Sequence, residues 1–302
     1  MQNTEIEITN VQIYPATKRL VPNFKLVKVT QKMGSKLYTD IVNGKRKGGV
    51  VEKKNHKKKG DIVSVYTVTN AKGYDNTDPL NVTDYAVLSV CASEYDVGNR
   101  YTTVAIILRG LIGKVGNQNV RPRPDQYQTI INSLKKLMFT GIEIDLSVTN
   151  DKLNYDGKKK ITSALLPAKI VETSINGKIV DDVIYFLDES PLMEIARARK
   201  QIITYDAKLL NVPNQNNTLL VIAIKNYVII RVLEIKLHKL TPTLTFCDIF
   251  EKCRIENAAK STKSHARSYV IAFFEHLQNK NEIFSFQISK KHNNFYSITF
   301  TY

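Results

Sequence analysis

The chain has 302 residues, with 44 Lys and Arg against 28 Asp and Glu, and carries a net charge of +16. This length is enough for two domains, and the basic balance favours a polyanionic partner such as DNA. The three cysteines have no metal-binding spacing and the polar start is unlike a secretory signal, so we expect buried thiols in the cytoplasm.

Residues 1–77 are predicted to form a small β-rich region. Alternating apolar residues over 24–29 and 61–68 predict short strands. Between them, residues 44–60 are rich in Gly and Lys and predict a basic loop, and 71–77 a linker. We expect this loop to contact phosphates through Lys53, Lys54, Lys57 and Lys58.

The next stretch, residues 78–188, predicts three helices followed by strands. Asn81 with Asp84 three residues later is a capping box at the start of the first helix. A second helix is expected from Thr102 to Arg109. Pro124 opens a third, with a period-3.6 apolar stripe from Tyr127 to Met138.

The polar side of this third helix, with the loop before it, is expected to face DNA. Its candidate contact residues are Arg121, Arg123, Gln126, Thr129, Asn132, Ser133 and Lys136. An alternating strand over 142–148 and a hairpin with Asn176-Gly177 at its turn follow the helix.

Residues 189–302 begin with two further predicted helices. Ser190 and Pro191 predict the start of a helix that joins the two halves over 191–210. The long apolar run over 218–240 predicts a core helix, although a buried strand is an alternative that its length disfavours. This run contains too many charged residues for a membrane span.

The carboxy-terminal stretch carries the clearest pattern. Thr245, with Asp248 three residues later, predicts the cap of a short helix, and a break follows at 254–257. A second helix then opens at Lys260, with a predicted buried stripe of Ala266, Val270, Phe273, Phe274 and Leu277. Alternation over 283–300 predicts a hairpin, with a basic turn at 290–294.

Helix, turn, helix and basic hairpin together are typical of a winged helix, whose second helix enters the major groove. The sequence thus predicts an α+β protein with two tandem winged-helix domains, 78–188 and 189–302, after the β-rich region. The candidate DNA-binding residues of the second domain are Lys260, Thr262, Lys263, Ser264, His265, Arg267, Ser268, Lys290 and Lys291.

A search for catalytic motifs predicts no enzyme, no metal and no cofactor. No Gly-Lys pair is followed by Ser or Thr as a phosphate-binding loop requires, and no two histidines have the spacing of a nicking enzyme. Glu143 and Asp145 share one face of a strand, as at a metal site, but such pairs are more often exposed surface charges. His276, near a helix end, is expected to interact with the helix dipole.

With these motifs the chain resembles plasmid-type replication initiators with paired winged-helix domains, which also occur in phages and integrative elements. The resemblance rests on Pro191-Leu192, on Leu219–Ile235 with Arg231 inside it, and on Phe246–Phe250 leading to Thr262–Leu277. It implies binding to repeated double-stranded origin sites, origin opening, a homodimer, and a host replicative helicase or its loader as partner. A winged-helix transcriptional regulator is the alternative, and a nicking or primase-type enzyme a more distant one.

Overall fold

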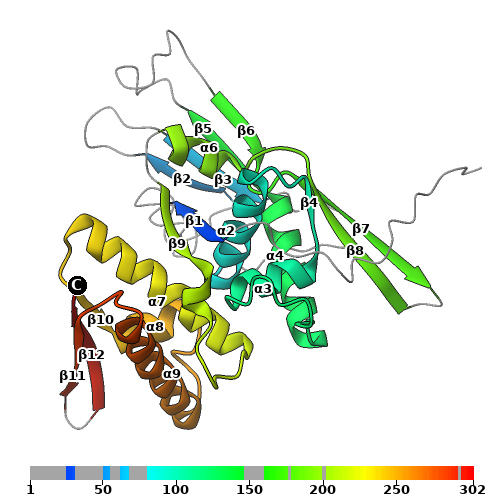
Figure 1. The fold of residues 1–302 in the computed structure, drawn as a ribbon. Helices are drawn as coiled ribbons and strands as arrows, with labels where there is room; N and C mark the ends of the chain where they lie inside the picture. The colour runs from blue at the N-terminus through cyan, green and yellow to red at the C-terminus, as the bar shows by residue number, and fades with distance from the viewer. Residues whose placement is uncertain are drawn as a thin grey trace, which may run out of the picture.

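The computed structural model describes residues 25–30, 50–54, 62–67, 80–145, 160–175, 178–198, 202–291 and 294–302. Over these residues the protein is a mixed α+β structure in which helices and antiparallel sheets pack around one continuous apolar core (Figure 1). The expectation of an α+β fold is therefore confirmed. The predicted linker at 71–77 and the predicted contact residues Lys57 and Lys58 lie outside the described residues.

A first unit has three helices, one short strand and a hairpin. Its elements are α2 (Val82–Asp96), β4 (Tyr101–Thr102), α3 (Val104–Leu111), α4 (Pro124–Phe139), β7 (Ala168–Ile175) and β8 (Lys178–Phe186). The strand order is β4-β8-β7, so the first, short strand pairs with the second strand of the hairpin. The helix expected from Thr102 begins two residues later than predicted, at Val104, because Thr102 lies in β4 and Thr103 caps α3.

A second unit repeats this order of elements. It consists of α7 (Leu219–His238), β10 (Thr243–Thr245), α8 (Phe246–Lys252), α9 (Lys260–Asn279), β11 (Ser285–Lys291) and β12 (Asn294–Thr301). Its strand order, β10-β12-β11, matches that of the first unit. The run over 218–240 is thus a helix, not a strand, and the Thr245 side chain caps α8 as predicted.

Two further strands, β5 (Thr140–Asp145) and β6 (Lys160–Ala164), lie between α4 and the hairpin of the first unit. They join β2 (Val50–Lys54) and β3 (Ile62–Thr67) in an antiparallel sheet of order β2-β3-β5-β6. The prediction of a loop over 44–60 was therefore wrong for 50–54. Val50 and Val51 are β-branched and pair with β3, and this pairing extends through the lysines Lys53 and Lys54.

The predicted single helix over 191–210 was also wrong. The segment divides into α6 (Pro191–Ala198), strand β9 (Ile202–Asp206) and the 3-10 turn η2 (Ala207–Leu210). β9 is rich in β-branched and aromatic residues, and it pairs antiparallel with β1 (Leu26–Thr30). Val27 and Val29 of β1 are buried with Tyr205 of β9, so burial against the core favours the strand over the helix.

The start of α2 is fixed by the capping box predicted from the sequence. Asn81 accepts a hydrogen bond from the Asp84 backbone N–H at 3.1 Å, and the Asn81 backbone N–H donates to the Asp84 carboxylate at 2.8 Å. The same buried carboxylate accepts a hydrogen bond from Ser133 Oγ of α4 at 2.6 Å and lies 3.9 Å from Lys136 Nζ. The cap of α2 therefore also anchors α4.

The last turn of α2 contains a buried acid with an incomplete set of hydrogen bonds. Glu94 accepts a hydrogen bond from the Asn99 side chain, but its Oε1 has no partner among the described residues. Burial raises the pKa of Glu94 from 4.5 to about 7. The carboxyl is then still protonated in the folded chain at pH values where the unfolded chain has already lost the proton.

We predict that Glu94→Gln stabilises the chain at pH 8 but not at pH 4.5. Because the folded pKa is raised, stability falls as pH rises from the unfolded pKa of 4.5 to the folded value of about 7, by about 3 kcal/mol. The amide carries no charge and does not incur this loss. Thermal unfolding followed by circular dichroism at both pH values measures the difference, and equal shifts in Tm at the two pH values would contradict the assignment.

The two units share an interface of backbone contacts and buried polar groups. The Asn226 amide of α7 donates to the Leu111 carbonyl of α3 at 3.1 Å. Gly113, at φ +72°, lies so close to η2 that an added Cβ would come within 2.4 Å of the Ala207 carbonyl oxygen. The Gln126 amide of α4 donates to the Asn217 carbonyl, just before α7, at 2.7 Å. These contacts join the units at several points.

Candidate nucleic-acid interface

Helix α9 has one buried side and one polar side. The stripe predicted from its spacing, Ala266, Val270, Phe273, Phe274 and Leu277, is completely buried. Phe274 lies 5.6 Å from the ring of Phe286 on β11 and 5.7 Å from that of Phe300 on β12. The apolar stripe therefore packs α9 against the hairpin and turns the remaining residues outward.

The first half of α9 forms the exposed side. Lys260, Ser264, His265 and Ser268 are exposed, and Thr262 and Lys263 are half-buried. No acidic residue occurs between Lys260 and Ser268, and no side chain caps the helix at Ala259. The free N–H groups of the first turn and the helix dipole therefore favour an anionic ligand, and the two lysines add to this preference.

Arg267 occupies a different position from the other candidates on this helix. Its guanidinium lies 5.4 Å from the ring centre of Phe250 on α8 and 5.9 Å from that of Phe295 on β12. Lys290 Nζ lies 5.1 Å from the same Phe295 ring. These cation–π contacts connect α9, α8 and the hairpin. Arg267 thus fixes the position of the hairpin beside the helix.

The hairpin β11–β12 lies beside α9 and adds a basic residue, Lys290, to this surface (Figure 1). Lys290 is exposed, while Lys291, whose side chain lies outside the described residues, pairs with Asn294. The predicted turn at 290–294 is shorter than expected, because both lysines belong to β11. Gln287 and Tyr296 are also exposed on these strands and are candidates that the sequence pattern did not single out.

In the first unit, α4 presents a different face from the one predicted. Gln126 and Ser133 were expected to contact DNA, but they are buried and bonded to Asn217 and Asp84. Lys136 is mostly covered beside Asp84. The prediction that these three residues contact DNA is therefore corrected. Their side chains bind or lie beside other groups of the protein instead.

The exposed residues of α4 and of the loop before it are mostly polar. Arg121 and Arg123 are exposed as predicted, although Arg123 pairs with Asp125 at 3.2 Å. Asn132 is exposed and accepts a hydrogen bond from Gln128 at 2.9 Å. Thr129 is half-buried and donates to the Asp125 carbonyl. Gln128 is also exposed and Lys135 is half-buried, and the sequence pattern did not single out either residue.

Other expectations about single residues need correction. His276 is buried, and burial together with Lys280 and Lys225 lowers its pKa, so the ring is neutral at pH 7 and does not act as a cation at the end of α9. Cys91 is buried as expected, but Cys247 is exposed.

Within the described residues, no three His, Cys, Asp or Glu side chains come together as they would around a metal ion. The side chains of Glu143 and Asp145 lie outside the described set.

No protein-family model and no curated protein sequence matches the chain. The crystal structure of RctB domains 2-3 is similar at a TM-score of 0.46 and 10% identity, covering 88% of this chain and 96% of that chain. The crystal structure of selenomethionine derivatives of domains 2 and 3 of RctB gives a TM-score of 0.40 and 9% identity, covering 86% and 93%. Among the helices that the structure describes, none has the length and apolar character required to cross a membrane.

Proposed function

We propose that the chain is a sequence-specific DNA-binding replication initiator built on two tandem winged-helix domains, residues 78–188 and 189–302. One observation carries the proposal: the exposed, acid-free first half of α9 lies beside a basic hairpin to which Arg267 and Phe295 connect it. In this proposal α9 enters the major groove and the hairpin β11–β12 is the wing.

Different parts of this surface suit different parts of a DNA duplex. The uncapped N-terminus of α9, Lys263 and Lys290 are suited to backbone phosphates, which position a protein without reading sequence. Ser264, His265 and Ser268 have short or planar polar side chains that can hydrogen-bond base edges. This division gives both the affinity and the specificity that binding to defined sites requires.

The first unit offers a second, less basic contact surface. Gln128 and Asn132 are exposed on α4, and side-chain amides of this kind form paired hydrogen bonds with adenine in the major groove. Two dissimilar contact helices in one chain favour an initiator, which holds an extended origin site, over a simple repressor. A transcriptional regulator is the second candidate, because one exposed basic helix would suffice for it.

We further propose that the protein has no nuclease, polymerase or ATPase activity of its own. Origin opening would then draw on binding energy, through deformation of an A·T-rich segment. In the same proposal the chain binds double-stranded origin repeats and can also form a homodimer, and the host replicative helicase or its loader joins after opening. The sequence motifs support this proposal, since none of them supplies a nucleotide-binding loop or a histidine cluster.

The test is a footprint of the purified protein on the DNA that flanks its own gene, followed by a strand-opening assay. Repeated sites spaced by about one helical turn are expected for the initiator, and one palindrome in a promoter would favour the regulator. On supercoiled DNA with Mg²⁺ we expect bases that react with a single-strand probe, without strand breaks. Protein-dependent nicks abolished by Glu143→Gln or Asp145→Asn would overturn the non-enzymatic proposal.

A further inference from the structure

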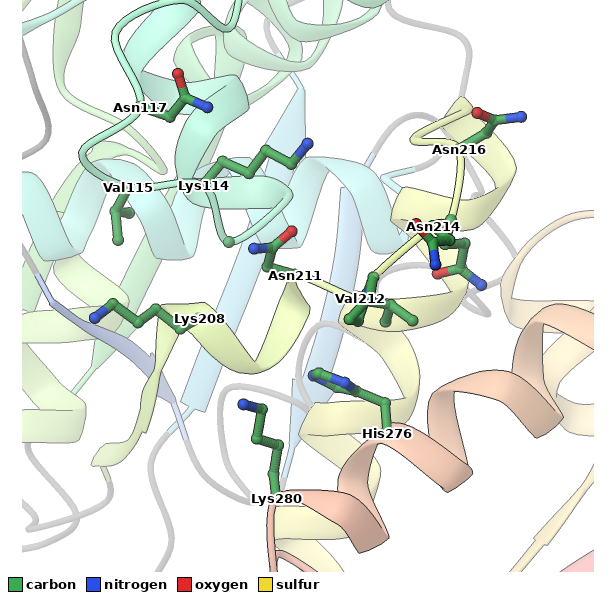
Figure 2. Close-up of a pocket in the computed structure, with 13 residues that line it drawn as sticks. Lys114, Val115, Asn117, Lys208, Asn211, Val212, Asn214, Asn216, His276 and Lys280 are labelled. Carbon is green, nitrogen blue, oxygen red and sulfur yellow. The ribbon is translucent and has the colours of Figure 1, made fainter.

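A pocket of about 770 Å³ lies where the two units meet. Three segments line it: the turn after α3, the stretch from η2 to the residues before α7, and the last turn of α9 (Figure 2). In the close-up, Lys280 and the ring of His276 extend from α9 toward Asn211 and Val212 on the middle segment. Its lining thus combines residues from both units.

Among the described residues, the charged groups of this pocket are all basic. Lys114, Lys208 and Lys280 line it, and no acidic residue of that set does. Within the part of the chain that the structure describes, none of these three amines pairs with a carboxylate. An anion is therefore the ligand class that would neutralise the charges in this pocket.

A fourth amine lies behind the pocket and adds to the unbalanced charge. Lys225 of α7 is buried, and its Nζ donates to the Leu210 carbonyl at 2.7 Å and to Asn217 Oδ1 at 2.9 Å. Both of these acceptors are uncharged. Burial and the nearby Lys114 lower the pKa of Lys225 to about 8. Positive charges thus repel one another across the junction of the units.

Two polar side chains of the pocket have hydrogen-bonding atoms that find no partner in the part of the chain that the structure describes. His276 is only 6% exposed, and its Nε2 has no partner among the described residues. A hydrogen bond with the backbone of Leu209 holds the ring in place. The side-chain nitrogen and oxygen of Gln215 also have no partner within that set, although neither is accessible to solvent. Buried polar atoms of this kind normally bind another group.

We propose that this pocket binds a phosphate-bearing ligand, which is attracted by the Lys114, Lys208 and Lys280 amines that line it. Lysine amines bind phosphate as point charges, and the pocket has the size of sites that hold small ligands. The phosphate belongs either to a free compound, such as pyrophosphate or a nucleotide, or to the backbone of bound DNA. In both cases it links the α3–α4 turn to α9 and so stiffens the junction between the units.

The test compares Lys208→Gln/Lys280→Gln with a charge-matched control, Lys25→Gln/Lys239→Gln, whose lysines are exposed and lie outside the pocket. In a first arm, pyrophosphate is titrated calorimetrically into each DNA-free protein at constant ionic strength. In a second arm, the salt dependence of duplex binding is measured for each protein. Lys114→Gln serves as an independent third variant in both arms.

Saturable pyrophosphate binding that weakens at least about tenfold in the pocket variants, but not in the control, supports a free phosphate compound. A salt slope that is reduced by about 0.9 or more only in the pocket variants supports a DNA phosphate. The proposal is overturned if neither arm distinguishes the pocket variants from the control. The first arm needs no DNA, so it can succeed even if the proposed origin binding fails.

Discussion

Replacing Gly113 by Ala should destabilise the folded chain by about 3 kcal/mol or more. Gly113 has φ +72°, a conformation that costs a residue with a side chain about 1–2 kcal/mol. The new Cβ would also lie 2.4 Å from the Ala207 carbonyl oxygen and 2.7 Å from the Asn211 backbone nitrogen. Both neighbours are backbone atoms, so the clash can be relieved only by moving η2 away from the α3–α4 turn.

Gly116→Ala, in the same turn, is the matched control. Gly116 also has a positive φ, +91°, but nothing lies within 4 Å of its would-be Cβ. It should therefore incur the conformational cost alone, about 1–2 kcal/mol. Urea unfolding followed by circular dichroism measures both variants. If the two alanines have equal effects, the turn and η2 are not in close contact, and the junction between the units is looser than described.

The double variant Lys263→Gln/Lys290→Gln should bind duplex DNA about 60-fold more weakly than the unchanged chain at 0.1 M salt, when the two affinities are scaled to be equal at 1 M. Each lysine is accessible on one side of the proposed interface, on α9 and on the wing. A lost phosphate contact reduces the salt slope by about 0.9, which corresponds to about eightfold at 0.1 M salt, and two losses multiply. Specific and non-specific duplexes should be affected alike, because phosphates carry no sequence information.

Fluorescence anisotropy over a salt series gives both the slope and the affinity. Lys25→Gln/Lys239→Gln removes the same charge from exposed positions outside α9 and the wing, and it should leave the slope unchanged. A control that loses as much affinity as the double variant would show that net charge alone drives binding. In that case α9 and its wing would lose their assignment as the DNA-contacting surface.

Local sequence signals predicted the second unit well because its elements are determined locally. The Thr245 cap and the apolar spacing of α9 are properties of one helix, and every residue of the predicted stripe is completely buried. β9 could not be predicted in this way. Its strand depends on pairing with β1, about 175 residues earlier in the chain, and sequence periodicity contains no information about that partner.

The candidate contact residues on α4 show the same difference between local and tertiary signals. Gln126 stands three residues after the cap Arg123 and accepts a hydrogen bond from its backbone N–H at 3.0 Å, although Arg123 is not the Ser or Thr by which a capping box is recognised in a sequence. The partner of Ser133, Asp84, is 49 residues away and reaches it only in the fold. The buried side of α4 is therefore wider than its apolar residues suggest.

Helix α7 has a consequence for attempts to divide the chain. It is buried on nearly all sides, from Val221 to Ile235, because α2 of the first unit covers one side and α8 and α9 of the second cover others. A cut at 211–218 would expose apolar surface on both fragments. We therefore expect neither half to be soluble when it is expressed alone. A chimera of two related chains would have to take α7 and the residues that pack against it from the same chain.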